Sequence, residues 1–143
     1  MTQRRGDPDV LQRVPANVAI LERLREGAER MRDGVGPWSP DGWVLRTHPD
    51  LTEVIERFAP DDLRHVYGIA TLIDAAGCIY AVGQGTGSVW LRIGDPRATS
   101  AAPASAAPVE GLPGWARVGA WEGGLDEAMQ AVTGGTQSGS HDA

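Results

Sequence analysis

Between residues 66 and 93 the apolar side chains recur with a period of two, and this alternation limits the fold more than any other feature of the chain. Three short segments rich in Val, Ile, Tyr and Trp are separated by turn-forming stretches at residues 74–77 and 83–87. Such a pattern is typical of antiparallel strands joined by hairpins. It predicts a three-stranded antiparallel meander, and residues 115–121 predict a fourth strand.

The second hairpin also predicts a register. A loop over residues 83–87 pairs Tyr80 with Trp90 and Ile79 with Leu91. Because successive side chains of a strand point to opposite faces, one face would carry Ile79, Ala81, Val89, Leu91 and Ile93, and the other Cys78, Tyr80, Val82, Trp90 and Arg92. Since both faces hold large apolar groups, either two layers cover the sheet or one face meets a partner.

Helical spacing is found on both sides of the meander. Residues 15–31 form the first predicted helix, with Gly34 as its stop and an apolar stripe at Val18, Leu21, Leu24, Ala28 and Met31. Residues 49–58 form the second, with Thr47 as cap and Pro49 in the first turn, and Pro60 ends it. Residues 125–132 predict a short third helix. The expected fold class is α+β: a four- or five-stranded, mainly antiparallel sheet with two to three helices packed mostly on one face.

A chain of 143 residues is the usual size of one domain. We expect residues 1–13 to be a flexible lead-in and residues 14–133 to form the single α+β domain. Within it, residues 95–113 are rich in Ala, Pro and Ser and predict a mobile loop. Residues 134–143 predict a disordered tail.

Composition excludes several classes of function. All 13 basic residues are arginine, so chemistry that requires a lysine is closed to this chain. The formal net charge of −6 argues against direct nucleic-acid binding and suits a basic protein partner. The lone Cys78 cannot form an internal disulfide, and no signal peptide or apolar run of membrane-spanning length is present. We therefore expect a cytoplasmic protein without a membrane segment.

No motif predicts catalytic residues, a metal or a cofactor. Asp61 and His65 would share a helical face, but two ligands from one turn do not make a metal site. The glycine-rich residues 83–87 are followed by a strand pattern, whereas a dinucleotide-binding loop opens a helix. No pair of carboxylates is placed by its spacing for general acid and base work.

We therefore expect a binding or regulatory module that acts through a protein contact, on a platform supplied by Trp38, Trp90 or Trp121. The candidate binding residues are Trp90, Tyr80, Arg92, His65 and Tyr67. The alternative is a small-ligand binder or enzyme with a pocket between the sheet and the 49–58 helix, in which His65 and Arg92 converge. A homodimer through an open strand edge at residues 115–121 is a third prediction.

The order of the segments resembles the TfoX amino-terminal domain family. The resemblance covers residues 65–121 and rests on four short stretches, at residues 65–68, 76–81, 89–94 and 114–118. The family's Met-Phe-Gly-Gly corresponds here to Val66, Tyr67, Gly68 and Ile69, so the Met and the second Gly differ. The resemblance implies a small α+β domain linked to the regulation of competence, with no catalytic residues to transfer.

Overall fold

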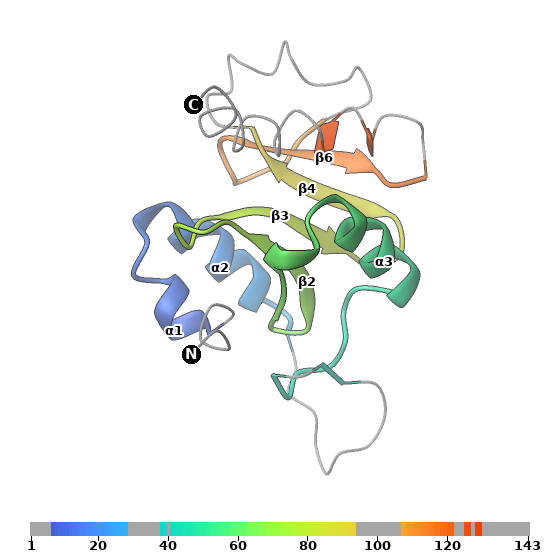
Figure 1. The fold of residues 1–143 in the computed structure, drawn as a ribbon. Helices are drawn as coiled ribbons and strands as arrows, with labels where there is room; N and C mark the ends of the chain where they lie inside the picture. Colours follow the sequence, from blue (N-terminus) through green and yellow to red (C-terminus); the bar gives the residue numbers. More distant parts are fainter. Residues whose placement is uncertain are drawn as a thin grey trace, which may run out of the picture.

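The protein is an α+β fold built on one antiparallel sheet of six strands (Figure 1). The computed structural model describes residues 7–28, 38–39, 41–93, 107–121, 125–126 and 128–129. In chain order the strands are β1 (Leu63–Val66), β2 (Ile69–Ile73), β3 (Ile79–Gln84), β4 (Ser88–Arg92), β5 (Ala107–Pro108) and β6 (Trp115–Gly119). Their spatial order is β1-β2-β3-β4-β6-β5. The predicted fold class, meander and later strand are confirmed, and β1 and the two-residue β5 bring the strand count above the expected four or five.

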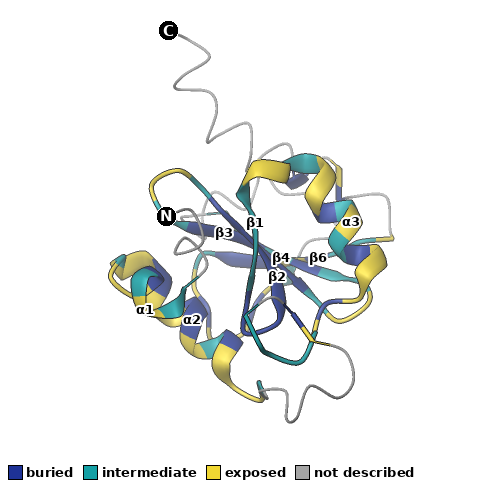
Figure 2. Cartoon of the chain, turned by 60° about the horizontal axis from the view of Figure 1, so that its bottom comes forward, coloured by how far each residue is buried: buried dark blue, intermediate teal, exposed yellow. Residues whose placement is uncertain are grey.

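Helices cover both faces of the sheet, so the expectation of helices mostly on one face is wrong (Figures 1 and 2). They are α1 (Pro8–Leu11), the 3₁₀ turn η2 (Pro15–Asn17), α2 (Val18–Arg25), α3 (Pro49–Phe58) and the 3₁₀ turn η3 (Pro60–Asp62). On one side, which we call the α2 face, Leu11, Ile20 and Leu24 pack on Ile69, Ile73, Ile79 and Val82. On the other, the α3 face, Leu51 and Ile55 pack on Ala70, Leu72, Tyr80, Ala81, Val89 and Leu91. Each amphipathic helix buries its apolar stripe against a different side of the sheet.

The amino-terminal region departs from the sequence expectation in two places. Residues 7–13, expected within the flexible lead-in, contain α1, and Leu11 is buried. The Asp7 carboxylate caps this short helix by accepting from the backbone N–H of Asp9 at 2.9 Å. In addition, α2 ends at Arg25, well before the predicted stop at Gly34, because Glu26 adopts an extended conformation. Met31 and Gly34 lie outside the described residues.

A β-bulge at Tyr80 changes which side chains share a face. Ala81 pairs with Leu91 and Val82 with Trp90, so the predicted pairing of Tyr80 with Trp90 is wrong by two residues. On the other side of β3, Leu72 pairs with Ala81 and Ile73 with Ile79, which leaves Tyr80 as the extra residue. Ile79 therefore turns to the α2 face and Tyr80 to the α3 face, the reverse of their expected places.

The segment before α3 is held by Thr47, which is buried rather than capping the helix. Its hydroxyl accepts from the backbone N–H of Ala70 at 2.9 Å and donates to the Gly83 carbonyl at 2.8 Å, which links β2 to β3. The cap of α3 is the next residue, His48, whose Nδ1 accepts from the N–H of Asp50. Residues 44–46, which lead into this segment, have no regular secondary structure.

Residues of the carboxy-terminal part pack against both faces of the sheet. Val109 and Leu112 are buried, so the end of the expected mobile loop is packed structure, whereas residues 94–106 and the predicted tail lie outside the described residues. β6 lies between β4 and β5, and Ala116 and Arg117 are paired on both sides. The open edge predicted there is therefore wrong at these two residues. Leu125, Ala128 and Met129 are helical and buried against the α3 face.

Candidate functional site

The structure separates the five candidate binding residues. Tyr80 is buried on the α3 face, where its hydroxyl donates to the Asp62 carboxylate at 2.6 Å. Trp90 lies half-buried on the opposite face, with the Arg23 guanidinium 5.6 Å from its ring centre. A cation over an aromatic face at this distance is attracted by the ring quadrupole. Tyr80 and Trp90 therefore form no common platform.

Arg92 belongs to an internal network on the α2 face. Its guanidinium donates to the Ile79 carbonyl and to the Asn17 side-chain oxygen, and it lies 5.4 Å from the centre of the Trp115 ring. Burial lowers the pKa of Arg92, and Cys78 and Asp74 act in the opposite direction. The residue stays a cation whose donors are directed at the fold itself.

His65 is in β1 and pairs with Ala70, which packs on the α3 face. Two strands separate β1 from β4, so at a spacing of about 4.8 Å per strand the backbones of His65 and Arg92 are at least about 14 Å apart. The two side chains also belong to opposite faces, so they do not converge in one pocket. Burial lowers the pKa of His65, and the Asp41 carboxylate opposes this shift.

The expected pocket beneath the 49–58 helix is filled at its centre. A Cβ added to Gly83 of β3 would lie 2.5 Å from Ile55 Cδ1 and 3.0 Å from Thr47 Cγ2. Glycine thus lets α3 approach the sheet closely here, and a larger residue would require the Ile55 side chain to shift. Leu51 and Ile55 have no solvent exposure.

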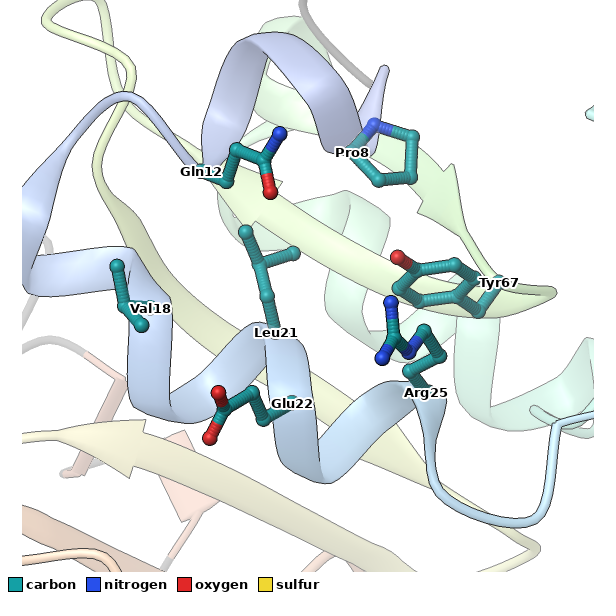
Figure 3. A pocket seen from close by; sticks show the side chains of 7 residues that line it. All are labelled: Pro8, Gln12, Val18, Leu21, Glu22, Arg25 and Tyr67. Carbon is teal, nitrogen blue, oxygen red and sulfur yellow. The ribbon is translucent and has the colours of Figure 1, made fainter.

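The fifth candidate, Tyr67, lines an open groove, and the other side chains of this groove come from α1, α2 and the residues beside them (Figure 3). The groove has a volume of about 360 Å³ and is lined by Pro8, Gln12, Val18, Leu21, Glu22, Arg25 and Tyr67. We call it the α1–α2 groove. Its volume is at the lower end of the roughly 300–1,000 Å³ typical of ligand pockets.

Tyr67 reaches the groove through an unusual backbone conformation. It is the only described non-glycine residue with a positive φ, 52°, and it forms the β1–β2 turn with Gly68 at φ 78°. Asn, Asp or Gly normally occupies such a turn, and the left-handed conformation costs another residue about 1–2 kcal/mol. The ring is held by an edge-to-face contact with Trp43, at 5.0 Å and 87°. Backbone strain of this kind is found preferentially at functional sites.

The floor of the groove is apolar and its rim is polar. Val18 is 43% exposed, one of three large apolar side chains of the described chain that face solvent. Arg25, Gln12 and Glu22 are exposed at the rim, and the Arg25 guanidinium lies beside the Tyr67 hydroxyl (Figure 3). Burial raises the pKa of Tyr67, while the Arg25 charge lowers it. An apolar floor with a polar rim is the general arrangement of ligand and protein contact sites.

The six other residues that line the groove with Tyr67 were not predicted as site residues. Residues 1–13 show no periodicity, so nothing indicated that α1 would pack beside α2. Val18 was predicted as part of the apolar stripe of this helix, but at the start of α2 it is exposed. The expected platform residues Trp38 and Trp121 are 58% and 60% exposed, but each adjoins residues outside the described part of the chain.

The described residues hold no group of three or more His, Cys, Asp or Glu side chains that could bind a metal ion. Among the helices of that same part, none has the length and apolarity to cross a membrane. The fold and groove thus define an α+β protein with one strained tyrosine at a partly apolar groove. Comparison of the chain with protein-family models, curated proteins and solved structures finds no match. The resemblance to the TfoX amino-terminal domain family stays a prediction.

Proposed function

We propose that this protein is a non-catalytic binding module that holds a short segment of a partner protein in the α1–α2 groove. The observation that carries the proposal is the exposed Val18 at a groove walled by the strained Tyr67. An apolar floor inside a polar rim is the arrangement found at protein contacts. The net charge of −6 favours a partner that is basic overall, because complementary charge speeds association.

Strain at Tyr67 supports this assignment over a purely structural role. A glycine or asparagine at this position would relieve the left-handed strain, but it would remove one wall of the groove. The ring is also only 8% exposed, so it gives the groove a rigid aromatic wall. Rigid aromatic anchors are favoured at contact sites because they lose little conformational entropy on binding.

Site-specific photocrosslinking tests the proposal. A photoreactive residue replaces the exposed Gln12 on the groove rim, and in a second protein it replaces the exposed Glu53 on α3. We expect a partner to be captured from the Gln12 position and not from the Glu53 position. Val18→Glu should abolish this capture, whereas Ala19→Glu, at the next exposed position of α2 and outside the groove, should leave it unchanged.

Each variant is first shown to fold, by its circular dichroism and its urea midpoint. Capture that is equal from the two positions, or that survives Val18→Glu, would show that the partner does not use the groove. Capture from the Glu53 position alone would show that the partner binds at α3 and not in the groove.

A further inference from the structure

Two hydrogen-bond donors meet at one corner of the α1–α2 groove. The Arg25 guanidinium and the Tyr67 hydroxyl lie beside each other at the edge of the groove (Figure 3), and the Arg25 charge acts to lower the pKa of this phenol. A phenol beside a guanidinium still has its own proton to donate.

The corner is therefore suited to an acceptor with two oxygens. A guanidinium presents five N–H donors in a planar fork, and only part of the fork is used by one phenol. Arg25 is exposed on the last turn of α2, so its remaining donors are accessible. A carboxylate could accept from the fork with one oxygen and from the Tyr67 hydroxyl with the other.

The remaining surface of the groove sets the direction of such a ligand. Val18 and Leu21 form the apolar floor beside the corner, and the Glu22 carboxylate points away from the Arg25 guanidinium in Figure 3. An anion at the Glu22 end would be repelled, whereas an anion at Arg25 would be attracted. Asp7 and Asp9 also act on the Tyr67 hydroxyl, but more weakly than Arg25 does.

We infer that the α1–α2 groove binds the carboxy-terminal end of its partner, with the terminal carboxylate on Arg25 and Tyr67 and the last apolar side chain on Val18 and Leu21. This inference rests on the proposed function, because it specifies which segment of the partner enters the groove. A carboxylate next to one apolar side chain also matches the size of the groove, which is too small for a folded surface.

The test uses the full chain and two synthetic probes. One probe is a hexapeptide, Gly-Ser-Gly-Ser-Ala-Leu, with a free terminal carboxylate, and the other is the same peptide with a terminal amide. Binding is followed by fluorescence polarisation and by amide shifts in two-dimensional NMR. We expect the free acid to bind at least about tenfold more tightly than the amide, the change expected when a charge-assisted contact is lost.

Arg25→Gln should reduce the affinity for the free acid to that for the amide, and Tyr67→Phe should remove part of the difference. Arg57→Gln removes the same charge from the exposed surface of α3 and should change neither affinity. In every protein that binds, the amide NMR shifts caused by the peptide should be confined to α1, α2 and the β1–β2 turn.

Three outcomes would overturn the inference. The first is equal affinity of acid and amide, with shifts still confined to the groove, which would leave the proposed function standing. The second is no binding of either peptide at millimolar concentration. The third is hexanoate, tested in parallel, binding as tightly as the peptide acid, which would assign the corner to a small carboxylic acid.

Discussion

Asn17 connects four parts of the fold through one buried side chain, so its removal gives the sharpest test of the structure. It has no solvent exposure. Its amide nitrogen donates to the carbonyls of Leu11, at 3.0 Å, and Gly77, at 2.8 Å. Its oxygen accepts from the backbone N–H of Ile79 at 2.9 Å and from Arg92 at 3.2 Å. The side chain thus ties α1 to the β2–β3 turn, to the bulged strand β3 and to β4.

The free-energy cost of Asn17→Ala depends on whether each group bonded to Asn17 keeps another hydrogen-bond partner. The Leu11 carbonyl also accepts from Val14, and Arg92 also donates to the Ile79 carbonyl, so these two groups keep a partner. The Ile79 N–H becomes a buried donor without an acceptor, which costs about 1–3 kcal/mol. With about 1 kcal/mol for each of the three other lost bonds, the free energy of unfolding should fall by about 4–6 kcal/mol. This is a large fraction of the roughly 5–15 kcal/mol typical of a domain.

Urea unfolding of wild type and Asn17→Ala, followed by tryptophan fluorescence, measures this change. At about 3–4 °C per kcal/mol for a chain of this length, the same loss should lower the midpoint of thermal unfolding by about 12–24 °C. Hydrogen exchange gives a local readout, because the amide of Ile79 should lose protection beyond the global change. The control is Gln12→Ala, which removes an exposed amide and should change the free energy of unfolding by less than about 0.5 kcal/mol. A loss below about 1 kcal/mol in Asn17→Ala would refute the reasoning, since it would mean that the four bonds do not hold these elements together.

Two further predictions concern a titrating group and a turn. Burial lowers the pKa of His65 below its ordinary value of 6.5, so the unfolded chain binds this proton more readily and the free energy of unfolding falls as the pH drops below 6.5. Thermal midpoints measured from about pH 8 to pH 5 should fall less in His65→Gln than in wild type, and an equal fall would contradict the assignment. Gly68 and Gly42 have similar backbone angles, with φ of 78° and 82°. A Cβ on Gly68 would lie 1.9 Å from the Val44 carbonyl oxygen, whereas a Cβ on Gly42 would have no atom within 4 Å. Gly68→Ala should therefore destabilise the protein by several kcal/mol more than Gly42→Ala. Equal urea midpoints for the two variants would show that the segment before α3 does not pass over this turn.

Local patterns were sufficient where a structure depends on neighbours in the sequence. The period of two over residues 66–93 predicted the meander, and the stripe of apolar residues with Pro49 in the first turn predicted α3 with its observed bounds at Pro49–Phe58. The α+β class followed from these two observations. The same patterns did not reveal β1, because its four residues show no complete alternation of buried and exposed positions.

Long-range contacts decided the register and the site. The bulge at Tyr80 depends on packing against α2 and α3 on opposite faces, so a two-residue shift and a reversal of Ile79 and Tyr80 could not be read from the hairpin alone. The groove needs α1, α2 and the β1–β2 turn to meet in space, and the strained Tyr67 is held by Trp43 from a distant segment. Sequence alone thus determined the kinds of element, since these follow from periodicity. Only the tertiary structure decided which side chains meet, because that depends on how the faces are covered.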